Sequence, residues 1–91
     1  MSRFLLHWER VIGEDVFSFQ GQEYIVEVGY CHSQLMIAIF HGDKFVHRSY
    51  LNDNNDVDEI RYSDLPPEIR IMTKHCCMSV VPRILALKAF Q

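Results

Sequence analysis

The residues of this chain whose types could do metal or thiol chemistry fall into two short clusters. They are Cys31-His32 and His75-Cys76-Cys77. Thiolate and imidazole are the ligands that tetrahedral zinc prefers, but paired zinc ligands are usually separated by roughly two to four residues. Adjacent side chains point to opposite faces of a strand and diverge by about 100° on a helix. The sequence therefore predicts no metal site and no cofactor.

A cysteine nucleophile would need a histidine close to it in space and a lowered thiol pKa. The chain has five histidines, yet no family signature of a cysteine enzyme surrounds Cys31 or Cys76. We therefore predict that the protein is not an enzyme and has no catalytic residues. The alternative is a small thiol- or zinc-dependent protein that uses Cys31, His32, His75 and Cys76.

A third chemically distinctive group is an Asn- and Asp-rich stretch over residues 52–59. Its four carboxylates are Asp53, Asp56, Asp58 and Glu59. The pattern does not fit an EF-hand, because a loop starting at Asn52 has Val57 where the turn glycine is needed. A carboxylate cluster repels itself and projects into solvent, so we predict an acidic contact surface for a basic patch on a protein partner.

Aromatic side chains add candidates for the same contact, because tyrosine and tryptophan carry much of the binding energy of protein interfaces. The chain has one tryptophan and four tyrosines. The predicted partner-binding residues are Asp53, Asp56, Asp58, Glu59, Tyr50, Tyr62 and Trp8.

Composition limits the class of protein. The chain has 91 residues, 48% hydrophobic and 23% charged, which is typical of one small globular domain spanning residues 1–91. The net charge of −3 disfavours generic nucleic-acid binding, which usually needs a basic face. A nucleic-acid-binding regulator is kept as a second alternative. It would use Arg48, Arg61, Arg70, Lys74 and Arg83.

The same composition bears on the compartment. No apolar run approaches the roughly 18 residues that a membrane span requires, and the N-terminus lacks the pattern of a signal peptide. Three cysteines are an odd number without the spacing of a disulfide framework, which predicts free thiols in a reducing compartment. We therefore expect a soluble cytoplasmic protein.

Two hairpins account for the first half of the chain. Residues 15–28 predict a hairpin with a Gly21-Gln22 loop, which pairs Phe19 with Tyr24 and Phe17 with Val26. The apolar run 35–40 predicts a strand buried on both faces, and a Gly42-Asp43 turn leads to a return strand over 45–50. The predicted core residues of these strands are Phe17, Phe19, Val26, Val28, Ile37 and Ile39.

Helical spacing appears at both ends of the chain. Apolar residues over 3–12 predict an N-terminal helix, with an edge strand as the alternative. Asp64 is expected to cap a second helix, which Pro82 breaks. The predicted fold class is α+β, with a four-stranded antiparallel sheet made of two hairpins, an N-terminal helix and a proline-broken C-terminal helical segment.

The function is argued by elimination. The leading hypothesis is a small protein-binding module that acts stoichiometrically on a larger protein as an inhibitor or adaptor. Phage- and plasmid-type inhibitors of host defence enzymes are an analogous class in size and charge. A homodimer is left open.

Overall fold

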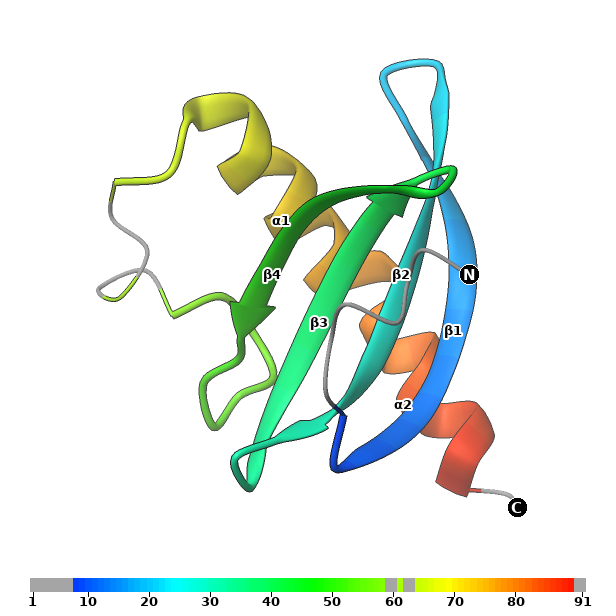
Figure 1. The fold of residues 1–91 in the computed structure, drawn as a ribbon, viewed down its shortest axis with the longest axis vertical. Helices are drawn as coiled ribbons and strands as arrows, with labels where there is room; N and C mark the ends of the chain where they lie inside the picture. The colour runs from blue at the N-terminus through cyan, green and yellow to red at the C-terminus, as the bar shows by residue number, and fades with distance from the viewer. Residues whose placement is uncertain (1–7, 59–60, 62–63, 90–91) are drawn as a thin grey trace.

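A computed structural model of the chain describes residues 8–58, 61 and 64–89 (Figure 1). Four strands pair in sequence order into one antiparallel sheet, and two helices follow. The elements are β1 (Arg10–Phe19), β2 (Gln22–Cys31), β3 (Gln34–His41), β4 (Lys44–Tyr50), α1 (Pro67–Ser79) and α2 (Val81–Ala89). The α+β class and the four-stranded antiparallel sheet are confirmed.

Both helices lie on one face of the sheet, behind the strands in Figure 1. We call this the helix-side face and its opposite the outer face. Alternate residues of the central strands, such as Val28 and Ile37, point to the helix-side face and are fully buried. The helices contribute Met72, Cys76, Val81 and Ile84 to the same core, together with Val80 between them. Among the described residues, neither helix has the length and apolar character that crossing a membrane would take.

The prediction of a central strand buried on both faces is confirmed. Residues 36–40 of β3 are at most 1% exposed, so both faces of this strand are covered. Five of the six predicted core residues are buried, and Phe19 is the exception. Phe19 lies at the end of β1, where it packs only partly against the core because the sheet ends there.

The first hairpin has the predicted faces but a different register. Phe17 pairs with Tyr24, and Phe19 pairs with Gln22. The turn is Gln20-Gly21 rather than Gly21-Gln22, and both of its central residues have positive φ (51° and 77°). A type I′ turn of this kind matches the twist of the flanking strands. The shift moves the pairing by two residues, so each side chain stays on its predicted face.

The prediction of an N-terminal helix over 3–12 is wrong for residues 8–12, the part of this range that the structure describes. β1 already begins at Arg10, and the Glu9 amide donates to the Tyr30 carbonyl as the strand approaches β2. An irregularity between Val11 and Gly13 interrupts the register, so the apolar residues 11 and 12 mimic helical spacing while lying in a strand. Residues 3–7 of the predicted helix lie outside the described residues.

The helical segment after the loop is broken by Pro82, as predicted. α1 ends at Ser79 and α2 begins at Val81, so the proline ring occupies the first turn of α2, where a missing N–H costs little. The expected cap at Asp64 is wrong: the N-cap is Pro66, which makes no side-chain cap bond. Proline at the start of the helix fixes φ near −65°, so the helix can begin without a polar cap.

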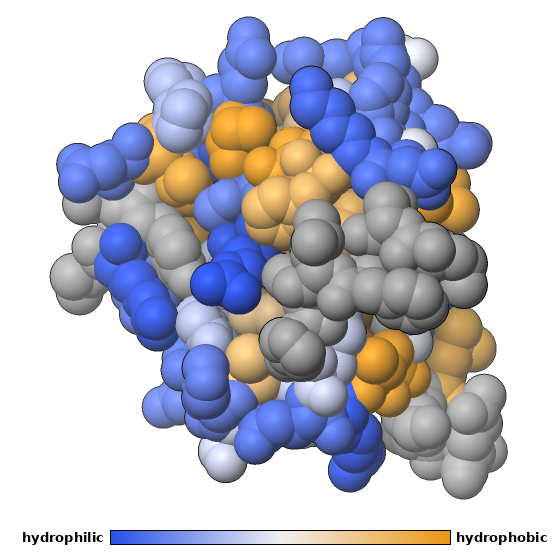
Figure 2. Space-filling view, viewed as in Figure 1, coloured by the Kyte–Doolittle hydropathy of each residue, from blue (hydrophilic) through white to orange (hydrophobic). Residues whose placement is uncertain are grey.

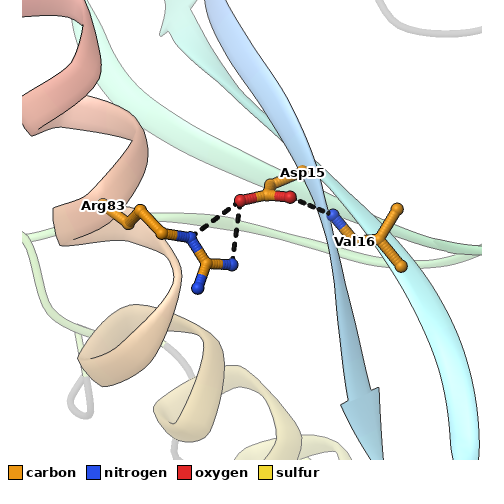
Figure 3. A network of polar contacts seen from close by, with 3 residues as sticks. All are labelled: Asp15, Val16 and Arg83. Carbon is orange, nitrogen blue, oxygen red and sulfur yellow. Dashed lines mark hydrogen bonds and ion pairs between the residues drawn. The ribbon is translucent and has the colours of Figure 1, made fainter.

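An ion pair fastens α2 to the edge strand β1 (Figure 3). Arg83 donates to the Asp15 carboxylate from Nε at 2.9 Å and from its terminal nitrogen at 2.8 Å. The Val16 amide also donates to Asp15, at 2.7 Å, and this bond is the main reason why the pKa of Asp15 lies below its usual value. A charged pair on an edge strand also disfavours pairing with another chain.

The outer face has an apolar row across all four strands at one end. Val16 pairs with Ile25, Ile25 with Phe40, and Phe40 with Phe45. Val16 and Phe45, at the two edges, are 45% and 39% exposed. Figure 2 looks onto this face and shows apolar surface bordered by hydrophilic side chains.

Candidate partner-binding site

The Asn- and Asp-rich stretch after β4 is a tightly bonded loop. Its two ends meet at an antiparallel bridge between Leu51 and Val57. The Asn52 side chain accepts the amides of Asn54 at 2.9 Å and Asp56 at 3.1 Å. The Asn52 amide donates to the Asp56 carbonyl at 2.8 Å. Asparagine suits this position because its short side chain can bond to backbone groups two and four residues ahead.

The loop is also anchored in the core. Leu51 and Val57 are 2% and 3% exposed and belong to the helix-side core. The Leu51 amide donates to the Leu35 carbonyl at 2.9 Å, and the Gln34 side chain donates to the Leu51 carbonyl at 3.4 Å. The carboxylates between the two anchors are therefore presented from a fixed backbone.

A hollow of about 550 Å³ lies beside this loop, between it and the β2–β3 turn. We call it the acidic hollow. Its walls are formed by Tyr30, Ser33, Gln34, Leu35, Leu51, Asn52, Asp53, Asn55 and Asp58. Two of the predicted site residues, Asp53 and Asp58, thus meet at one concave surface. Asp58 accepts the Arg61 amide at 3.2 Å, and Asp53 is exposed.

The other two carboxylates of the prediction are not in the hollow. Asp56 accepts the Val57 amide at 2.7 Å and lies near Cys77, where its charge helps to raise the pKa of that thiol. Asp56 is therefore turned toward α1. Glu59 and Tyr62 lie outside the described residues.

The remaining predicted residues, Tyr50 and Trp8, lie on the outer face. Tyr50 is 9% exposed and packs with Cys31 and Met36, and Trp8 covers this cluster. Successive residues of a strand point to opposite faces, so Tyr50 is directed away from the core that receives Leu51. The structure therefore separates the predicted aromatic residues from the acidic hollow.

Glycine at position 29 lets the Trp8 ring lie directly on the sheet. A Cβ at Gly29 would approach Cε3 of Trp8 to 2.7 Å and the carbonyl oxygen of Arg10 to 2.5 Å. Because the second of these atoms belongs to the backbone, a larger residue could not be accommodated by moving Trp8 alone.

The aromatic residue that does line the hollow is Tyr30, which the prediction did not include. It is 37% exposed, and the Arg10 guanidinium lies 5.7 Å from the centre of its ring. Its residue type is the signal in the sequence, because tyrosine is common at protein interfaces. Its place beside the loop comes from the structure: Tyr30 pairs with Leu35, whose carbonyl accepts the Leu51 amide.

The four residues of the thiol or zinc alternative do not converge. Cys76 is fully buried in the helix-side core, and His75 is exposed beside the rings of Phe17 and Phe19. Cys31 lies across the sheet, in the outer-face cluster. Within residues 8–58, 61 and 64–89, no three His, Cys, Asp or Glu side chains are grouped to hold a metal ion.

The two helix-side thiols are poor nucleophiles. Burial raises the pKa of Cys76 to about 12, and the neighbouring Cys77 adds to the effect. Burial likewise raises the pKa of Cys77 to about 12. Since only the thiolate is reactive, these cysteines act as small apolar core residues at neutral pH.

The basic residues of the nucleic-acid alternative are spread over the molecule. The Arg61 guanidinium lies over the Tyr50 ring on the outer face. The positive charge of Arg48 is also near Tyr50, where it acts to lower the pKa of the hydroxyl. Arg70 and Lys74 belong to α1 on the opposite side, and Arg83 is paired with Asp15. These five side chains do not form one basic face.

Comparisons with protein-family models, with curated proteins and with solved structures found no match for this chain. The function is therefore inferred from the geometry of the chain's own sites.

Proposed function

We propose that this protein binds a basic segment of a larger protein in the acidic hollow. The observation that carries the proposal is the meeting of Asp53, Asp58 and Tyr30 at one concave surface of about 550 Å³. Carboxylates accept short, charge-assisted hydrogen bonds from arginine or lysine, and the tyrosine ring provides a face for a cation.

The chemistry of the hollow suits an arginine or lysine side chain. The Arg10 guanidinium lies 5.7 Å from the centre of the Tyr30 ring, an example within this chain of the contact that a guanidinium makes with an aromatic ring. Leu35 adds a partly buried apolar wall, against which the methylene stem of a long basic side chain can pack. The hollow therefore offers partners for both the charged end and the apolar stem.

The rigid loop favours binding. The Asn52 bonds and the buried anchors Leu51 and Val57 fix the backbone around Asp53 and next to Asp58 before a partner arrives. Binding to a preformed surface avoids the entropic cost of ordering a loop. Rim carboxylates also increase the association rate with a basic partner, by an amount that salt reduces.

A binding surface of this kind needs no chemistry of its own, so we propose stoichiometric action as an inhibitor or adaptor. By analogy in size and charge, we extend the proposal to inhibitors of the phage or plasmid type that cover a site on a host defence enzyme. A homodimer would be detected by sedimentation of the purified protein across a range of concentrations.

The test compares two variants that change the same loop. Asp53→Asn/Asp58→Asn removes both carboxylates from the hollow, whereas Asp56→Asn changes the one that is turned toward α1. Binding of a fluorescent arginine-rich peptide is measured by anisotropy at two salt concentrations. We expect the double variant to weaken binding about tenfold or more, with a smaller salt dependence, and Asp56→Asn to bind as the wild type does.

A neutral peptide of the same length controls for non-specific binding, and thermal melting of each variant controls for folding. Equal affinity of the wild type and the double variant for the arginine-rich peptide would remove the acidic hollow from the proposal. Once the peptide result is known, a pull-down with the wild type and the double variant identifies the natural partner as the protein retained only by the wild type.

A further inference from the structure

Three metal-ligating side chains meet on the outer face, at the end of the sheet where β2 turns into β3. The Cys31 sulfur lies 3.7 Å from Nδ1 of His32, which lies 2.9 Å from the Tyr50 hydroxyl. That hydroxyl donates to the Cys31 sulfur at 3.6 Å. Sulfur, nitrogen and oxygen donors thus form a closed triangle from two strand ends.

The turn is what brings the adjacent residues Cys31 and His32 together. His32 and Ser33 have φ of 53° and 60°, so they form a tight turn with left-handed backbone. The alternation of a regular strand ends at Cys31, and the His32 ring folds back toward its neighbour. Adjacent side chains point apart only in regular strands and helices, and His32 lies in neither.

The dimensions of the triangle suit a first-row metal ion. Bonds of about 2.3 Å to sulfur and about 2.0–2.2 Å to nitrogen and oxygen, at tetrahedral angles, place the donor atoms roughly 3.3–3.6 Å apart. The two edges that include sulfur, at 3.6 and 3.7 Å, already fall near this range. Only the 2.9 Å edge between His32 and Tyr50 must open, by a few tenths of an ångström.

The donor set and its surroundings select the kind of ion. Thiolate and imidazole favour Zn²⁺ or Cu⁺, whereas Mg²⁺ and Ca²⁺ require oxygen ligands. Met36 is 1% exposed in the same cluster, and Trp8 packs against it, so one side of the triangle is apolar. His32 is exposed, which leaves a path from solvent.

Charge further limits the ion. The Arg61 guanidinium lies 4.4 Å from the centre of the Tyr50 ring, so an added positive charge is opposed from that side. The Cys31 thiolate cancels one positive charge, which makes the site neutral with Cu⁺ and singly positive with Zn²⁺. A thiophilic ion of low charge therefore fits best.

We propose that Cys31, His32 and Tyr50 form a binding site for a thiophilic metal ion of the Zn²⁺ or Cu⁺ kind. On binding, the sulfur–metal bond replaces the S–H bond of Cys31, and the thiol proton passes to the buffer. Neutral His32 carries its proton on Nε2 and binds through Nδ1, and the Tyr50 hydroxyl keeps its proton and provides an oxygen lone pair as the third donor. This site is separate from the acidic hollow and does not depend on the proposed function.

The test titrates the reduced, full-length protein with Zn²⁺ and, in a separate arm, with Cu⁺ under anaerobic conditions, each against a chromophoric chelator. Co²⁺ serves as a spectroscopic probe, because thiolate ligation produces an intense charge-transfer band. We expect one equivalent to bind. Cys31→Ser should abolish the band and weaken binding at least about 100-fold, and Tyr50→Phe should weaken it about tenfold.

The matched controls are His75→Gln and Cys76→Ala, which alter the second cysteine–histidine cluster and should leave binding unchanged. His32→Asn is a second test variant that should also weaken binding, because asparagine removes the imidazole and tolerates the left-handed backbone of this exposed turn position. Failure of both ions to bind overturns the proposal. So does equal loss of affinity in Cys31→Ser and Cys76→Ala, which would indicate non-specific binding to thiols.

Discussion

The chain contains two places where a cysteine and a histidine are neighbours in sequence, Cys31-His32 and His75-Cys76, and their side chains are arranged differently in the fold. In the first pair, the Cys31 sulfur and the His32 nitrogen lie 3.7 Å apart at a turn, with the Tyr50 hydroxyl beside them. In the second, α1 places Cys76 in the core and leaves His75 exposed. Neighbouring side chains of a helix diverge by about 100°, whereas the left-handed backbone of the turn folds His32 back.

This contrast shows where chemistry can occur in so small a fold. The helix-side core is apolar and raises the pKa of both Cys76 and Cys77 to about 12. The outer-face cluster gives Cys31 polar neighbours, and the hydrogen bond between Tyr50 and Cys31 is the main reason why the pKa of Tyr50 is raised. Polar sites therefore gather at the strand ends, next to the turn and the acidic loop.

The largest expected difference between the two faces is in stability. Ile37→Ala, at a fully buried helix-side position, should lower the free energy of unfolding by about 2–5 kcal/mol. Val16→Ala on the outer face, 45% exposed, should cost less than about 1 kcal/mol because little apolar area is lost. Urea unfolding of both variants measures the difference. Similar losses would mean that the outer row is buried in solution.

A smaller difference in the free energy of unfolding is expected between serine substitutions of Cys76 and of Cys31. Cys76→Ser places a hydroxyl in the apolar core and should lower the free energy of unfolding by about 1–3 kcal/mol. Cys31→Ser should cost less than about 1 kcal/mol, because the new hydroxyl can accept the bond from Tyr50. The comparison is made on metal-free protein by urea unfolding. A greater loss at Cys31 would contradict the polar description of the outer cluster.

The smallest effect concerns the contact that fastens α2 to the sheet. The pKa of Asp15 is lowered in the fold, so its contribution to stability is present above the unfolded value of 3.8 and is lost as the pH falls through the lower folded value. Asp15→Asn should remove this pH dependence and cost about 0.2–1 kcal/mol at neutral pH. Arg83→Gln should keep part of the dependence, because the Val16 amide still bonds Asp15.

Unfolding of these variants at pH 3 and pH 7, at low and high salt, measures that contribution. An unchanged pH profile in Asp15→Asn would show that other carboxylates account for the acid sensitivity.

Much of the fold was predictable because it depends on local pattern. The apolar run over 35–40 identified the central strand, and Pro82 identified the break between the helices. The register of the first hairpin was not predictable to the residue, since a turn at Gln20-Gly21 leaves the same faces as one at Gly21-Gln22. Val11 and Ile12 are neighbouring apolar residues, which is typical of helical spacing, but they lie where the register of β1 is irregular and strict alternation is interrupted.

The candidate sites were predictable only in part. Asp53 and Asp58 were identified from charge alone, but their companion Tyr30 comes from another strand. Cys31 and His32 were identified as ligand types, but the donor that completes their triangle is Tyr50, which is distant in sequence. One sequence without structure gives residue types and local spacing, and it does not give the distance between two strand ends.

The sequence by itself determined the sheet, the faces of its strands and the break at Pro82. Each depends on a local feature: the alternation of polar and apolar residues, a run of apolar residues, or the N–H group that proline lacks. Only the tertiary structure decided that Tyr50 meets Cys31 and His32, and that Asp53 and Asp58 share a hollow with Tyr30. These meetings depend on strand register and on the left-handed turn at His32, which are fixed when the whole sheet packs against its helices.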